Sequence, residues 1–214
     1  MTNSPGELAQ PVPHRSDLPR EVAGISIPDS AIAVQATELA RESSVPYLFN
    51  HVMRSYLFGA LIGRLDGLQY DPELLYVAAV LHDLGLTNRF AGPRRFEVEG
   101  AEAARAFLLT QGVPRDRAEL VWDAIALHIT FGTALSKGPE VALTHIGAGV
   151  DVVGRRLDEL PPSSVEQVLA AYPRLGLKRE ILHKLVQELA EKPGAGFPLT
   201  LDHLAAILRT PFAE

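Results

Sequence analysis

From residue 29 onward, apolar side chains recur at intervals of three and four residues, with polar residues between them. In the segment 47–65, for example, Leu48, His51 and Ser55 fall on one side of a helix. This period is typical of helices that bury one face, whereas strand-like alternation is scarce. The pattern therefore predicts an all-α fold, with helices at about residues 30–41, 47–65, 72–84, 97–111, 114–129, 139–157, 163–172, 177–191 and 200–209.

Residues that favour helix ends support these boundaries. Asp29 or Ser30 can cap the first helix, and Asp71 with Pro72 after it suits the start of the third. Gly85 is expected to end the third helix in the left-handed conformation. The core of this helix, LLYVAAVLHDL, is apolar nearly all round, which predicts a place at the centre of a helical bundle.

The N-terminal segment has a different character. It carries five prolines before residue 29, and proline discourages long helices because it lacks the N–H group and has a fixed φ. We expect an irregular, proline-containing arm over residues 1–28, followed by one helical domain over residues 29–214.

The pair His82-Asp83 ends the most apolar of these helices. Buried charge needs a partner or a metal, although a hydrogen-bonded core histidine beside a capping Asp83 explains the pair equally well. His51 lies on the inner face of its own helix, above small residues that allow another helix to come close. Asp151 lies on an inward-facing stripe of small residues. Together these four residues offer two imidazoles and two carboxylates, a set that suits one divalent transition metal and leaves positions free for water or substrate.

Composition narrows the chemistry further. The chain has no cysteine, which excludes disulfides, thiolate catalysis and cysteine-ligated metal sites. The net charge of -6 argues against nucleic acid and favours a small-molecule partner. No apolar run is long enough to span a membrane, and no secretion signal is evident at the N-terminus. We therefore expect a cytoplasmic protein without a membrane partner, which can form homo-oligomers.

The order His51, His82-Asp83, Asp151 resembles the metal-ligand pattern of the HD domain, over about residues 45–157. The resemblance implies an all-α HD-domain bundle and one divalent metal, with Zn²⁺ the first choice and Fe²⁺, Mn²⁺ or Ni²⁺ as alternatives. More narrowly, the chain is similar to the cyanamide hydratase-like branch, on the segments PYLFNHVMRSY, LHDLGLT, RFEVEGAEAA and VDVVG. Phe96 stands where binuclear relatives carry a further histidine, which favours a single metal.

Other residues are candidates for the substrate side of the site. His128 matches a place where relatives keep a histidine, and we expect it to act on substrate, the alternative being a core histidine bonded to a carbonyl. Further candidates for binding substrate are Glu97, Arg54, Asn88 and Phe96. Three of them also have simpler explanations, because Glu97 can stabilise the helix dipole, Arg54 can face the solvent and Asn88 can be an ordinary polar loop residue.

The remaining histidines have weaker settings. His145 lies about 120° around its helix from Asp151 and is expected to be structural. His14, His183 and His203 are expected to have surface or packing roles.

These observations lead to three functional hypotheses. The first is a hydratase (a lyase) in which metal-activated water adds to a small nitrile-type carbon, with Asp83 handling a proton and His128 orienting the substrate. The second is a phosphohydrolase acting on a nucleotide or another phosphate ester. The third is a non-catalytic helical module that senses a metal or a ligand.

Overall fold

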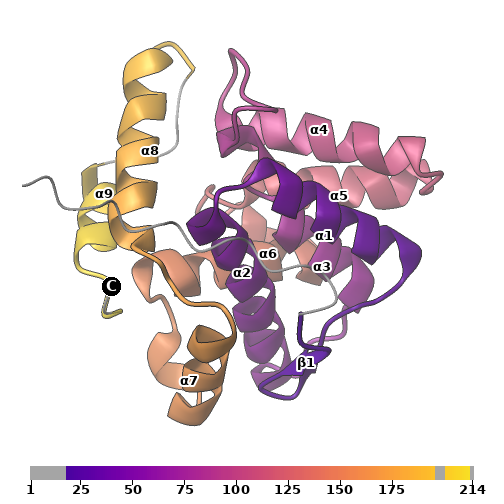
Figure 1. The fold of residues 1–214 in the computed structure, drawn as a ribbon, viewed down its shortest axis with the longest axis vertical. Helices are drawn as coiled ribbons and strands as arrows, with labels where there is room; N and C mark the ends of the chain where they lie inside the picture. Colours follow the sequence, from indigo (N-terminus) through magenta and orange to yellow (C-terminus); the bar gives the residue numbers. More distant parts are fainter. Residues whose placement is uncertain (1–17, 196–200, 213–214) are drawn as a thin grey trace, which may run out of the picture.

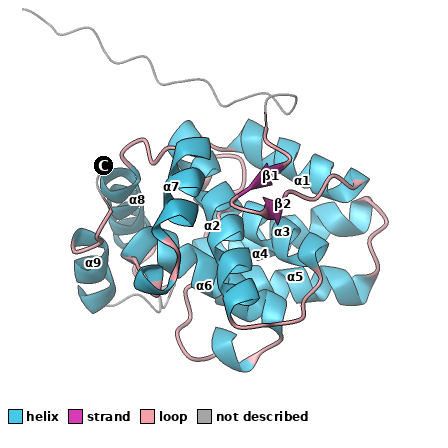
Figure 2. Ribbon diagram, turned by 90° about the horizontal axis from the view of Figure 1, so that it is seen from below, coloured by secondary structure: helices cyan, strands magenta, loops and turns pink. Residues whose placement is uncertain are grey.

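The computed structural model describes residues 18–195 and 201–212. This part of the chain is almost entirely helical, as Figures 1 and 2 show, and the predicted all-α class is confirmed. The helices are α1 Ala31–Ser43, α2 Pro46–Leu65, α3 Pro72–Leu81, α4 Phe96–Thr110, α5 Arg115–Leu127, α6 Pro139–Val153, α7 Pro162–Ala171, α8 Leu177–Glu191 and α9 Leu201–Leu208.

A short hairpin lies within the segment that the sequence predicts to be irregular. Strands β1 (Glu21–Val22) and β2 (Ile25–Ser26) pair antiparallel, and the two residues between them have positive φ, as tight hairpins require. The apolar residue of each strand is buried in the core. Strands of two residues are too short to produce a recognisable alternation. Residues 1–17 of the predicted arm lie outside the described residues.

Helices α2 and α6 cross at very close range. A Cβ atom added at Gly147 would lie 2.0 Å from the carbonyl oxygen of Ser55, and one added at Gly59 would lie 2.6 Å from that of Leu143. Only glycine fits where two backbones approach this closely. The expectation that small residues beneath His51 let another helix approach is therefore confirmed.

Helix α3 fills the centre, and every residue from Leu74 to Leu81 is buried. Its start is as predicted, because the Asp71 side chain accepts hydrogen bonds from two backbone N–H groups of the first turn. The predicted end, near Leu84 with Gly85 in the left-handed conformation, is wrong, because the helix stops at Leu81 and Gly85 does not have a positive φ. Gly85 instead makes room for α4, since a Cβ there would lie 1.9 Å from the carbonyl oxygen of Phe96.

Helix α6 also ends earlier than predicted. The sequence pattern runs to about residue 157, but Gly154 adopts a left-handed conformation with φ of 72° and ends the helix at Val153. None of the helices in the described part of the chain is both long and apolar enough to cross a membrane.

Candidate metal centre

Three potential ligand atoms meet where α2 faces the end of α3. The Nε2 atoms of His51 and His82 are 3.2 Å apart, and each lies 3.4 Å from Oδ2 of Asp83. Tetrahedral ligands at about 2.0–2.1 Å from zinc are separated by about 3.3–3.4 Å, so these three atoms match one face of such a site. The residues are almost completely buried. These three residues could therefore hold one divalent metal ion, as the resemblance to the HD domain implies.

Hydrogen bonds fix both rings in the form that a metal needs. His82 donates its Nδ1–H to the carbonyl oxygen of Ala79 at 2.7 Å, and His51 donates its Nδ1–H to Oδ2 of Asp151 at 2.7 Å. Each Nε2 is then left with its lone pair toward the other two ligand atoms. Burial lowers the pKa of His82 despite the opposing charge of Asp83, which keeps the ring neutral and able to ligate.

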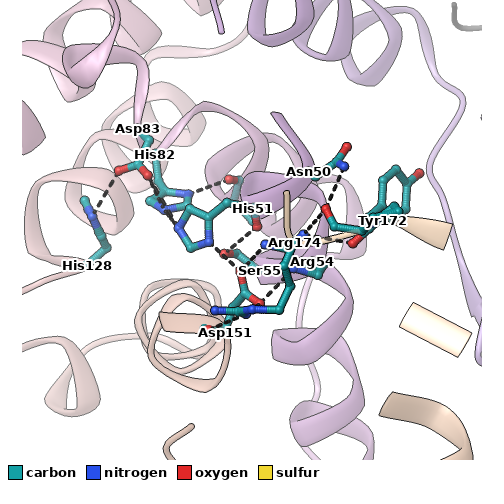
Figure 3. Close-up of polar contacts among 12 residues, drawn as sticks. Asn50, His51, Arg54, Ser55, His82, Asp83, His128, Asp151, Tyr172 and Arg174 are labelled. Atoms are coloured by element: carbon teal, nitrogen blue, oxygen red, sulfur yellow. Dashed lines mark hydrogen bonds and ion pairs between the residues drawn. The ribbon is translucent and has the colours of Figure 1, made fainter. Parts of the chain in front are cut away.

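Asp151 lies behind His51, as Figure 3 shows. Arg54 donates hydrogen bonds to both carboxylate oxygens of Asp151, from Nε to Oδ1 and from Nη2 to Oδ2, each at 2.8 Å. Arg174 donates a further hydrogen bond to Oδ1 at 2.9 Å. Burial alone would raise the pKa of Asp151, but the charge of Arg54 and the hydrogen bonds from His51 and Arg54 hold this pKa below its usual range. The structure thus connects the predicted ligand Asp151 to the triangle through the His51 ring. Its direct ligation stays a prediction.

His128 lies on the other side of Asp83, at the C-terminal end of α5. Its Nε2 is 3.6 Å from Oδ1 of Asp83, and its Nδ1 donates to the carbonyl oxygen of Ile125 at 2.6 Å. Burial, reinforced by the neighbouring His82, lowers the pKa of His128 to about 3. The ring is therefore neutral at pH 7, with a free lone pair beside the ligand triangle.

A small cavity of about 90 Å³ adjoins these residues. A cavity needs roughly 10–15 Å³ of such space to hold one water molecule, so this one has room for a small-molecule ligand. Neither arginine nor lysine is among the described residues that line it. Its walls are mostly apolar and come from the turn after α3 and from α4, α6, α8, α9 and the segment after α5: Leu86, Phe96, Ile129, Phe131, Ala148, Gly149, Val152, Val153, Ile181, Leu185 and Ile207.

Of the other residues predicted to bind substrate, one lines the cavity and three do not. Phe96 lines the cavity, with its ring centre 5.6 Å from that of His128. Arg54 points to Asp151 and does not line the cavity, and Asn88 is exposed outside it. Glu97 is fully buried but also outside the cavity lining. Its carboxylate pairs with Arg95, Nε to Oε1 at 3.1 Å, and burial raises its pKa.

Two histidines that the sequence assigned to packing also line the cavity, namely His145 and His203. His145 does lie away from the Asp151 side of α6, as its spacing predicts. The cavity, however, is on the side where His145 points. A signal was present in the sequence, because His145, Ala148, Gly149 and Val152 form a second stripe at intervals of three and four residues.

Comparison with known proteins agrees with this geometry. The family model described as "HD domain" matches residues 48–172, a range that contains His51, His82, Asp83, His128 and Asp151. Two curated relatives, the cyanamide hydratases DDI2 and DDI3 of Saccharomyces cerevisiae, are each 28% identical to this chain over 177 residues, which is 80% of this chain and 78% of each relative. Because the family match spans more than half of the chain and includes the buried ligand triangle, the chain belongs to the HD-domain family and is a metal-dependent enzyme of that family.

Proposed function

We propose that this protein adds water to a small nitrile-type compound such as cyanamide, which would give urea. The observation that carries this proposal is the cavity, which is small, apolar, free of cationic side chains among its described lining residues and open to the ligand triangle. The similarity to two cyanamide hydratases supports the same reaction.

The residues of the chain suit such a hydration. A divalent ion bound by His51, His82 and Asp83 would supply Lewis acidity and lower the pKa of water. The water oxygen forms a bond to the nitrile carbon, and one π-electron pair of the C≡N bond moves to nitrogen. Asp83 takes a proton from this water and passes it to that nitrogen, while His128, whose Nε2 is 3.6 Å from Oδ1 of Asp83, orients the reactants through its free lone pair. Tautomerisation of the adduct then gives the amide, without a leaving group.

The cavity argues against a phosphate ester as substrate. Anionic phosphoryl oxygens call for convergent arginines, lysines or paired metals. Among the cations near the site, Arg54 binds Asp151, Arg94 pairs with Glu99 and Arg95 pairs with Glu97. Arg155 lies over the Phe131 ring and is not among the described residues that line the cavity. A purely sensory role is disfavoured because the ligand triangle borders a cavity from which water or substrate can reach the ion, as at the open position of catalytic sites.

A direct comparison of rates tests the proposal. Protein of measured metal content is assayed for urea formation from cyanamide and, in parallel, for phosphate release from nucleoside monophosphates. We expect hydration to be faster. Phosphate release without detectable hydration of cyanamide or other small nitriles would replace the hydratase with a phosphohydrolase, and activity on neither class would favour the sensory module.

Other features of the protein belong to the same proposal. Zn²⁺ is the preferred ion because the ligand triangle has tetrahedral dimensions and two imidazole donors, with Fe²⁺, Mn²⁺ and Ni²⁺ as alternatives. Elemental analysis of protein purified without chelators decides between them. A cytoplasmic location and a homo-oligomeric state remain predictions, which fractionation and size-exclusion chromatography with light scattering would test.

A further inference from the structure

His145 lines the cavity and carries a buried acceptor atom without a hydrogen-bond partner in the described part of the chain. The residue lies on α6 and is only 3% exposed, and it lines the cavity together with His128 and Phe131. Its Nε2 has no hydrogen-bond partner among the described residues. A buried polar atom without a partner is costly, so a partner from a ligand or from water is expected at this place.

The tautomer of His145 follows from its other nitrogen. Nδ1 lies 2.6 Å from the carbonyl oxygen of His128, and a carbonyl can only accept, so Nδ1 carries the proton. Burial lowers the pKa of His145, against the effect of that hydrogen bond, which keeps the ring neutral. Nε2 is therefore an acceptor and not a donor.

Aromatic packing holds the ring in this orientation. Phe131 meets His145 at a distance of 5.2 Å between ring centres and an angle of 88°, an edge-to-face arrangement. The guanidinium carbon of Arg155 lies 4.2 Å from the centre of the Phe131 ring, and His203 stacks on this ring at 4.4 Å. The acceptor is thus fixed in direction before any ligand enters.

We propose that His145 Nε2 accepts a hydrogen bond from an N–H group of the substrate, and that this contact selects nitriles bearing an amino group over nitriles of equal size without one. This inference rests on the proposed function and names its substrate class. The reacting carbon would face the ligand triangle and His128, whereas the amino group would face His145. The apolar wall residues supply shape but no charge.

Cyanamide and acetonitrile form a matched pair of probes, because an amino group in one replaces a methyl group of similar size in the other. The first measurement is the side-chain ¹⁵N spectrum of zinc-loaded protein during titration with each probe. We expect the His145 Nε2 resonance to shift with cyanamide and to stay unchanged with acetonitrile. This result does not depend on turnover. An unchanged Nε2 resonance with cyanamide would overturn the inference, whether or not the protein is a hydratase.

Two variants distinguish the role of Nδ1 from the role of Nε2 in the His145 ring. In His145→Asn the amide NH₂ can keep the bond to the His128 carbonyl, but no acceptor reaches the Nε2 position. In His145→Gln the longer side chain returns an acceptor to that position. We expect His145→Asn to lower kcat/KM for cyanamide relative to acetonitrile by about threefold to tenfold, mainly through KM, and His145→Gln to restore most of the ratio.

Equal loss on both probes in His145→Asn would mean that the ring only packs, and it would overturn the inference. If the protein hydrates neither probe, the proposed function fails. The inference is then decided by the affinities of the two probes, measured by titration for the unsubstituted protein and for both variants. Metal content and circular dichroism of each variant establish that the comparison is made between folded, loaded proteins.

Discussion

Three histidines at the centre share one arrangement, in which Nδ1–H donates a hydrogen bond to a fixed oxygen and Nε2 faces the site. The oxygens belong to Asp151 for His51, to Ala79 for His82 and to Ile125 for His128. A neutral ring of defined tautomer is the form that binds metal or accepts a proton. The chemistry of the site is therefore set by these oxygens as much as by the histidines.

The ligand triangle predicts that single substitutions empty the site. His82→Ala or Asp83→Ala should reduce bound metal from about one ion per chain to a small fraction, because two ligands rarely retain an ion against buffer. Elemental analysis after gel filtration measures this. His183→Ala, which changes an exposed residue of α8, is the matched control and should keep full occupancy. Full occupancy in Asp83→Ala would contradict the assigned ligand set.

Asp151→Asn distinguishes a direct ligand from a residue that positions His51. An asparagine oxygen can still accept from His51 Nδ1 but lacks the charge. If Asp151 positions His51 without touching the ion, metal affinity should fall by about 10–100-fold, the usual effect of losing a partner behind a ligand, and the visible spectrum of the cobalt-substituted protein should stay nearly unchanged. A changed ligand-field spectrum together with loss of metal would instead establish Asp151 as a ligand.

His128→Ala should separate catalysis from metal binding. The substitution removes a hydrogen-bond acceptor next to Asp83 but none of the three atoms of the triangle. We expect unchanged metal content and a loss of about 10²–10⁴ in kcat, the range for a positioned acid–base group. Turnover equal to that of the unsubstituted protein would return His128 to the role of a core histidine.

At the scale of elements, the close crossing of α2 and α6 holds His51 against Asp151. Gly147→Ala would force a Cβ atom against the backbone of α2 and should lower the free energy of unfolding by at least about 1–3 kcal/mol. Gly149→Ala on the same helix meets only ordinary contacts at 3.9 Å, and it should be neutral or stabilising by up to about 1 kcal/mol. Urea titration measures both, and equal effects would contradict the argument from close packing.

The elements also show what could be predicted from the sequence. Helix α3 was predictable, because its cap Asp71 and its apolar run act locally, and so was the assembly of His51, His82 and Asp83 from the family pattern. The role of Gly85 was not, since it depends on where α4 lies. Local signals define where helices begin. From the sequence alone, however, a glycine that allows close packing looks the same as a glycine that allows a turn, because the difference depends on where the neighbouring element lies.

The whole molecule builds the cavity from segments that are far apart in the sequence, from His51 on α2 to Ile207 on α9. Such a space depends on how the last helices pack against the first. This is why the sequence placed His145 on the correct side of α6 but gave it no function. The substrate-binding candidates Arg54 and Asn88 fell outside the cavity for the same reason.

Metal binding and folding should be coupled across the whole molecule. Among the residues that the structure describes, the buried Asp83 carboxylate has the imidazole rings of His51, His82 and His128 within 4 Å but no arginine or lysine, so a bound ion would supply the missing positive charge. An ion that binds only the folded chain stabilises it by about 2.7 kcal/mol at 100 times its dissociation constant. For a chain of this size that corresponds to a rise in Tm of about 5–10 °C. Calorimetry of chelator-treated and zinc-reloaded protein measures the rise, which His82→Ala should abolish. An equal Tm in both states, with zinc shown to be bound in one, would mean that the ion also binds the unfolded chain.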